Sequence, residues 1–162
     1  MFAMKQYTII LTLLFSGAIS HSAHAVDAAM SFTGNLVEAP CVINNGGPIT
    51  VAFGNVVTTQ VDGTYKRMEV PYTLTCQATV PINMKISGTA TSFTSSGTLQ
   101  TSVSDLGIQL QLGSTPITLN TAWSFNPAGT KPALYAVPVK NPTGTLAAQA
   151  FTASATMSID YP

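Results

Sequence analysis

The sequence predicts an all-β protein built as a two-sheet sandwich. Short runs of alternating or β-branched residues recur along the chain, and no segment shows the sustained 3.6-residue period of a helix. Turn-forming pairs such as Asn45-Gly46, Asp62-Gly63 and Asn141-Pro142 separate these runs. Many short strands joined by such turns, in a chain of this length, are typical of two packed antiparallel sheets.

The first element is a predicted secretory signal in residues 1–25. Lys5 precedes an apolar run over residues 8–19, and Ala25 is a small residue of the kind that signal peptidase prefers. The run has about a dozen residues, whereas a membrane-spanning helix needs roughly 20. The sequence therefore predicts export without direct membrane insertion, and one domain in the remaining 137 of the 162 residues.

The second element is a predicted N-terminal extension, residues 26–37, whose alternation indicates a strand. Its apolar face carries Met30, Phe32, Gly34 and Leu36. Glycine weakens a strand and often marks the close approach of another group. One explanation for Gly34 is that the strand fills a groove in another molecule and crosses a shallow part of it. The alternative is an ordinary first strand within its own sandwich.

The next feature is a pair of cysteines, Cys41 and Cys76. Exported chains fold in an oxidising compartment where thiols pair, so a disulfide is predicted, with two buried free thiols as the alternative. A metal site is not expected, because two cysteines without a histidine supply too few ligands.

The middle of the chain supplies the remaining predicted strands before the last one. They are the runs CVIN, ITVAFG, MEVPYTLTC, VPINMKISG, LGIQLQLG, PITLN and ALYAVPV. Each lies between clusters rich in Gly, Pro or Asn, which is the pattern of strands joined by turns.

The last predicted strand has the clearest alternation in the chain. One of its faces carries Phe151, Ala153, Ala155, Met157, Ile159 and Tyr161, and the opposite face is polar. Because no predicted strand follows it, an open sheet edge and an incomplete core are expected. The chain thus has an apolar N-terminal extension and, beside its last predicted strand, an incomplete core. Both features are explained if the extension of one molecule fills the groove of its neighbour.

The composition argues against an enzyme. Both histidines, His21 and His24, lie in the predicted signal, so the exported part lacks the commonest general base. Asp105 and Asp160 are the conceivable carboxylate pair of a glycosidase, but a turn and the polar face of a strand favour solvated residues. No catalytic residue, cofactor or metal is predicted.

The charge argues against two classes of partner. Only 7% of the residues are charged, against about 25% in typical soluble domains. Nucleic acids and anionic membrane surfaces are therefore not predicted as partners, because both are recognised mainly through clusters of basic side chains.

Taken in order, these features resemble the pilin subunits of the chaperone–usher pathway of Gram-negative bacteria. The resemblance rests on FTGNLVEAPCVINNG, on YTLTC ending at the second cysteine, and on FTASATMSIDYP with its penultimate tyrosine. It covers essentially the whole exported chain. It implies that residues 38–162 form an incomplete immunoglobulin-like sandwich that lacks its final strand, preceded by a donor-strand extension.

The resemblance also implies partners and site residues. A periplasmic chaperone lends a strand until assembly, an outer-membrane usher takes part in export to the cell surface, and neighbouring pilin or adhesin subunits follow in the fimbrium. The donor-strand residues are then Met30, Phe32, Gly34 and Leu36. The strand from Phe151 to Tyr161 borders the groove and pairs with the chaperone. For Tyr161, a plain core or interface aromatic is the alternative.

The resemblance finally suggests a position within the pilus. The lead-in Ala39-Pro40-Cys41 and the following INNG are similar to minor tip or adaptor subunits. The predicted function is therefore a structural subunit of an adhesive pilus, polymerised by donor-strand exchange and involved in cell adhesion as a tip adaptor. The major shaft subunit and a receptor-binding β-sandwich module are the alternatives.

Overall fold

The computed structural model describes residues 28–36, 40–77, 80–94 and 97–161. The chain divides into two units, residues 1–35 and residues 36–162. The predicted signal peptide, residues 1–25, lies outside the described residues. So do positions 26, 27 and 37 of the predicted extension, and positions 38 and 39 of the predicted pilin domain.

The regular elements in the described part of the second unit are mostly short strands. Its elements are β1 (Val42–Ile43), η1 (Asn44–Gly46), η2 (Thr58–Gln60), β2 (Met68–Glu69), β3 (Leu74–Thr75), β4 (Ile82–Ser87), β5 (Leu99–Gln100), β6 (Leu106–Leu112), β7 (Thr115–Pro116), β8 (Ala122–Phe125), β9 (Leu134–Lys140) and β10 (Thr156–Asp160).

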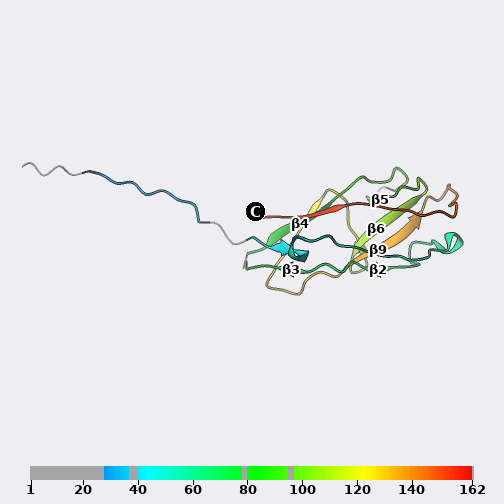
Figure 1. The fold of residues 1–162 in the computed structure, drawn as a ribbon, viewed down its shortest axis with the longest axis horizontal. Coiled ribbons are helices and arrows are strands. Elements are labelled where there is room, and N and C mark those ends of the chain that lie inside the picture. The colour runs from blue at the N-terminus through cyan, green and yellow to red at the C-terminus, as the bar shows by residue number, and fades with distance from the viewer. Residues whose placement is uncertain (1–27, 37–39, 78–79, 95–96, 162) are drawn as a thin grey trace, which may run out of the picture. The chain divides into compact units, whose positions relative to one another are not determined.

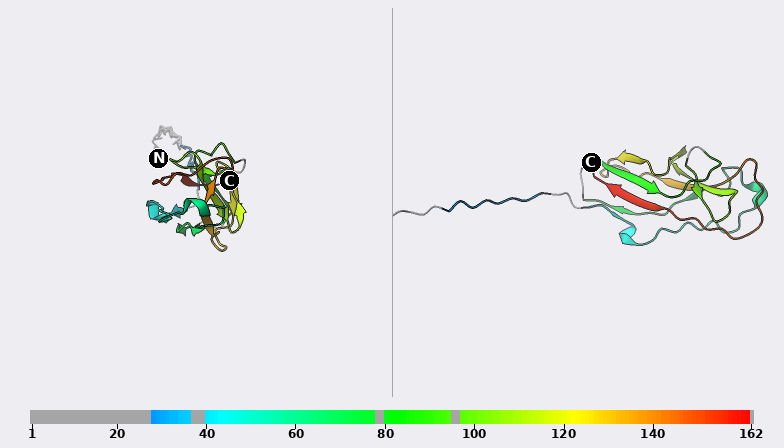
Figure 2. Two further views of the ribbon diagram at one scale, coloured as in Figure 1. Left: turned by 90° about the vertical axis from the view of Figure 1, so that its right-hand side faces the viewer. Right: turned by 90° about the horizontal axis from the view of Figure 1, so that it is seen from above.

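The strands form two main antiparallel sheets (Figure 1, Figure 2). One sheet has the order β10-β4-β8, and the other has the order β2-β9-β6-β5 with β7 paired to β6. A further small pair joins β1 to β3. The predicted all-β sandwich is confirmed.

The core consists of apolar side chains from both main sheets and from the segments that connect their strands. Its buried members are Val70, Tyr72, Met84, Ile86, Leu99, Ile108, Leu110, Ile117, Leu119, Leu134 and Ala136. Burying one large apolar side chain contributes roughly 1.5–3 kcal/mol, so this cluster is the main source of the stability of the domain.

Strand β10 packs the apolar face of the last predicted strand against the core. Met157 lies opposite Ile86 and Ile159 lies opposite Met84 in the antiparallel register with β4. All four side chains belong to the core or pack against it. Among the described residues β4 is the only sheet neighbour of β10, so the other edge of β10 has no strand beside it.

The predicted disulfide is present. Cys41 and Cys76 are bonded to each other beside the β1–β3 pair, and they lie 35 positions apart along the chain. Closing a loop of that length stabilises a fold by about 4 kcal/mol on the chain-entropy model. The hydroxyl of Tyr161 accepts a hydrogen bond from the N–H of Cys41, which ties the end of β10 to the same region.

The strand prediction differs from the structure in several places. Strand β5 (Leu99–Gln100) was not predicted, and of the predicted run PITLN only Pro116 belongs to a strand. Residues 49–54, the run ITVAFG, and residues 151–155, the first half of the last run, are not assigned to strands. Both segments border the groove described below and lack a full set of ladder hydrogen bonds there. Strand β8 was not among the predicted strands, because its four residues between Asn120 and Asn126 are too short to give a clear period.

Candidate functional site

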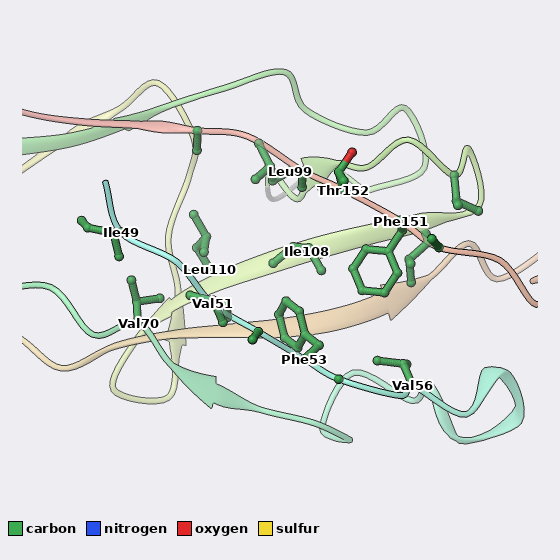
Figure 3. A pocket seen from close by; sticks show the side chains of 18 of the residues that line it. Ile49, Val51, Phe53, Val56, Val70, Leu99, Ile108, Leu110, Phe151 and Thr152 are labelled. Atoms are coloured by element: carbon green, nitrogen blue, oxygen red, sulfur yellow. The ribbon is translucent and has the colours of Figure 1, made fainter. Parts of the chain in front are cut away.

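An apolar groove of about 1260 Å³ lies between two segments that are far apart in the sequence. Residues 48–56 form one side, here called the first wall, and residues 146–157 form the other, called the second wall. The floor is made by core side chains, including Val70, Ile86, Leu99, Ile108, Leu110 and Leu134. Figure 3 shows Ile108 and Leu110 of β6 between the two walls.

The first wall is an alternating segment without a strand partner. Ile49, Val51 and Phe53 are half-buried against the core, while Thr50 and Ala52 are exposed. Among the described residues, no backbone–backbone hydrogen bond involves positions 49–56. The side chains therefore hold this wall in place, and its backbone groups remain available for a strand.

The second wall is lined mainly by small side chains. Those that contribute to the groove are Ala147, Ala148, Ala150, Ala153 and Ala155. Because a methyl group projects little, these positions leave space above the floor. Bulky side chains from an added strand would fit there.

Among the described residues, the backbone of the second wall near Thr152 is bonded on one side only. The N–H of Ser102 donates to the carbonyl of Thr152 at 2.8 Å, and the N–H of Thr152 donates to Ser102 Oγ at 3.1 Å. Neighbouring residues of an extended chain direct their backbone groups to opposite sides. The N–H and C=O groups of Phe151 and Ala153 therefore point away from Ser102, as those of an unpaired edge do.

A carboxylate positions the start of the second wall. Asp105 Oδ1 accepts a hydrogen bond from Asn141 Nδ2 at 2.8 Å, and Asp105 Oδ2 accepts one from the Thr145 N–H at 3.3 Å. Gly144 packs so closely here that a Cβ atom would lie 2.3 Å from Asp105 Cγ. Asp105, considered above as a conceivable catalytic group, thus has a structural role in holding the loop that leads into the wall.

The structure brings together four of the six residues predicted for the groove edge. Phe151, Ala153, Ala155 and Met157 line the groove, while Ile159 packs against the core and Tyr161 bonds to Cys41. Their pairing with a chaperone stays a prediction. The prediction did not include the first wall, although the alternation of ITVAFG was the signal that could have identified it.

The described residues of the predicted extension, 28–36, contain no regular secondary structure. Their large apolar side chains are exposed, with Met30 at 80%, Phe32 at 88% and Leu36 at 105% of full exposure. A Cβ added at Gly34 would meet nothing within 4 Å. The donor role of these four residues stays a prediction.

The chemistry of the groove suits an apolar polypeptide. Among the described residues, no side chain that lines the groove is ionisable, and its polar members are residues such as Asn55, Gln149 and Thr152. Within the described residues, no cluster of three or more His, Cys, Asp or Glu is placed to hold a metal ion. The described residues likewise contain no helix with the length and apolar character needed to cross a membrane.

A β-sandwich with an open apolar groove between unpaired edges is an incomplete immunoglobulin-like domain. A family model described as fimbrial protein matches residues 30–162. The chain therefore belongs to the fimbrial protein family, and it is a pilin of the chaperone–usher type. Pilins are structural proteins, which confirms the prediction that the chain is not an enzyme.

Individual relatives agree with this assignment. The chain is 37% identical over 162 residues to the uncharacterized fimbrial-like protein YfcQ of Escherichia coli (strain K12), covering 95% of this chain and 98% of the relative. It is 29% identical over 164 residues to the fimbrial adapter PapF of Escherichia coli, covering 93% of this chain and 98% of PapF. The solved structure of the P pilus adaptor subunit PapF is similar with a TM-score of 0.60 and 28% identity, covering 79% of this chain and 100% of that one.

Proposed function

We propose that this pilin is a minor adaptor subunit that polymerises by donor-strand exchange. The observation that carries the proposal is the groove, whose walls have unpaired backbone edges and whose floor is the apolar core. The N-terminal extension of a neighbouring subunit is the occupant. It pairs its backbone with the walls and directs alternate side chains toward the floor, which is the general mode of strand addition to a sheet edge.

The chain's own extension has the alternating apolar side chains that such an occupant needs. Met30, Phe32 and Leu36 alternate with polar residues and are exposed, so they are available for burial in a neighbour. Removing a large apolar side chain from water contributes roughly 1.5–3 kcal/mol. Gly34 interrupts the bulky series, which suits a point where the groove is shallow.

Family membership supports the proposed partners and route. A periplasmic chaperone occupies the groove before assembly and contacts the strand that ends at Tyr161. An outer-membrane usher then passes the subunit to the cell surface, where neighbouring pilin or adhesin subunits flank it. The adaptor position is supported by the similarity to PapF.

The replacement Gly34→Leu tests the donor strand. Since a Cβ added at this position meets nothing within 4 Å, we expect the subunit to fold and accumulate normally. Its assembly into fibres should fail, because overpacking a fitted groove costs about 1–3 kcal/mol. Soluble subunit and assembled fibre are measured in parallel by quantitative immunoblotting.

Thr33→Leu is the matched control, because it adds the same side chain on the opposite face of the strand. We expect this variant to assemble. Normal fibres from Gly34→Leu would contradict the donor role of Gly34. Loss of soluble Gly34→Leu subunit would instead support an ordinary first strand within the chain's own sandwich.

The adaptor position has its own test. An adaptor is present in few copies at one end of a fibre, whereas a shaft subunit repeats along its length. Immunogold labelling of an epitope-tagged chain should therefore give label at fibre ends. Label distributed along the shaft would assign the chain to the shaft instead.

A further inference from the structure

Apolar side chains are exposed at the end of the domain to which the N-terminal extension is attached. Among the described residues from 40 to 161, the exposed large apolar side chains are those of Val42, Val57, Met68, Val80 and Tyr161. Three of them, Val42, Val80 and Tyr161, lie close to the first cysteine after the extension. They are 43%, 39% and 38% exposed.

A hydrogen bond and the strand register place these three side chains at one end of the domain. Val42 follows Cys41 directly, and the N–H of Cys41 donates to the hydroxyl of Tyr161. Tyr161 follows β10, the end of which pairs with the start of β4, and Val80 lies two residues before β4 begins. Figure 1 shows β3 and the end of β10, drawn in red, at this same end.

A hollow of about 320 Å³ lies beside these side chains. Leu74, Phe125 and Pro127 contribute apolar surface to it, and Cys76, which is bonded to Cys41, also lines it. Among the described residues its one ionisable side chain is that of Lys131, whose Nζ donates to the carbonyl of Tyr72 at 2.7 Å. The hollow and the three exposed side chains are together called the basal surface, and this surface is largely apolar.

The basal surface is joined to the extension by a short tether. Leu36 is the last apolar residue proposed for the donor strand, and four positions separate it from Cys41. The five steps from Leu36 to Cys41 span at most about 18 Å when fully extended. When Leu36 lies in the groove of a neighbouring subunit, that subunit must therefore come close to the basal surface.

We propose that the basal surface forms a second contact between subunits, in which it packs against the same neighbour that receives the extension. The inference rests on the proposed function, because donor-strand exchange is what brings that neighbour within reach. The tether makes the second contact intramolecular, so that even a weak apolar contact forms. The contact arises at assembly, and a chaperone that fills the groove before then does not prevent it. Its partner is an uncharged, apolar end of a pilin.

Site-specific photo-crosslinking in assembled fibres tests this contact. The photoreactive analogue p-benzoylphenylalanine replaces Met30, Phe32, Val42 or Val80 in separate chains. Positions 30 and 32 report which subunit receives the extension. We expect positions 42 and 80 to crosslink to that same subunit, identified by mass spectrometry. Met68 is the matched control, because it is an exposed apolar residue of β2 outside the basal surface, and we expect no crosslink from it to that subunit.

The outcomes separate the basal contact from the proposed function. Crosslinks from positions 30 or 32 without any from positions 42 and 80 would overturn the basal contact and leave donor-strand exchange intact. Crosslinks from positions 42 and 80 to a different pilin, or to the chaperone alone, would also overturn it. Absence of a crosslink from both positions 30 and 32 to any pilin would overturn the proposed function, and the basal contact with it.

A longer tether provides the second arm of the test. The insertion Gly-Ser-Gly-Ser-Gly-Ser after position 38 adds up to about 20 Å of reach. We expect crosslinking from position 80 to the receiving subunit to fall several-fold, because a longer tether lowers the effective concentration of the two surfaces. Crosslinking from position 32 should stay unchanged. An equal yield from position 80 with both tethers would overturn the role of the tether in forming the contact.

Discussion

At the scale of single residues, the groove depends on side chains that lie outside it. Asp105 illustrates this point, because its carboxylate bonds to Asn141 and to the backbone of Thr145, just before the second wall begins. Only glycine fits at position 144 without moving that carboxylate. A single residue without a side chain thus helps to determine where one wall of the groove starts.

Gly144→Ala should therefore destabilise the domain. Its methyl group would displace the Asp105 carboxylate and break the bonds to Asn141 and Thr145, at a cost of about 1–3 kcal/mol. Urea unfolding measures the loss. Gly34→Ala is the control, since its Cβ meets nothing within 4 Å and its stability should equal that of the parent. A Gly144→Ala variant as stable as the parent would contradict the role of this contact.

Tyr72 is the residue through which the structure predicts a response to alkaline pH. It is 2% exposed, and its hydroxyl donates a hydrogen bond to the carbonyl of Pro132 at 2.6 Å. Burial raises the pKa of Tyr72 to about 12 from 10.0. The folded state therefore retains this proton at a pH where the unfolded chain loses it.

The stability that Tyr72 contributes is complete below about pH 10 and is lost as the pH rises toward 12. We expect the urea midpoint to fall over this range and to fall less steeply for Tyr72→Phe, which has no proton to lose. Denaturation series at several pH values would measure both slopes. An equally steep fall in Tyr72→Phe would assign the effect to other groups.

At the scale of elements, the two walls differ from the rest of the sandwich in their backbone bonding. Strand β6 pairs with β9 along its whole length, whereas the first wall has no backbone–backbone hydrogen bond among the described residues. A polypeptide segment with an alternating sequence but no neighbour lacks the ladder that defines a strand. The first wall is thus an alternating segment with no strand beside it among the described residues.

Hydrogen exchange tests this difference between elements. In the isolated subunit we expect rapid exchange for the amides of residues 49–56 and slow exchange for those of β6, because exchange follows the stability of the local hydrogen bonds. Adding the peptide of residues 28–37 should slow exchange in both walls. Walls already protected without the peptide would contradict their description as unpaired edges.

At the scale of the whole molecule, the open groove leaves part of the core incomplete. A ligand that binds only the folded state stabilises it by RT ln(1 + [L]/Kd). A strand that fills the groove therefore connects assembly to stability, and the subunit should be more stable within a fibre than alone.

Thermal unfolding in the presence of the peptide of residues 28–37 measures this connection. At a peptide concentration 100 times its Kd we expect a stabilisation of about 2.7 kcal/mol, seen as a rise in Tm. A scrambled peptide of the same composition should leave Tm unchanged, because its apolar residues no longer alternate. An equal rise with both peptides would indicate non-specific apolar binding.

The sequence by itself determined the all-β class, the disulfide and the inward face of β10, because each follows from a local pattern or a residue count. The resemblance to pilin subunits added the prediction that the strand from Phe151 to Tyr161 borders a groove, and Phe151, Ala153, Ala155 and Met157 line the groove of the structure. Only the tertiary structure decided that residues 48–56 form the opposite wall and that Phe53 meets Phe151 across it. The physical reason is sequence distance, since these walls lie about a hundred positions apart and no local periodicity reports which segments meet.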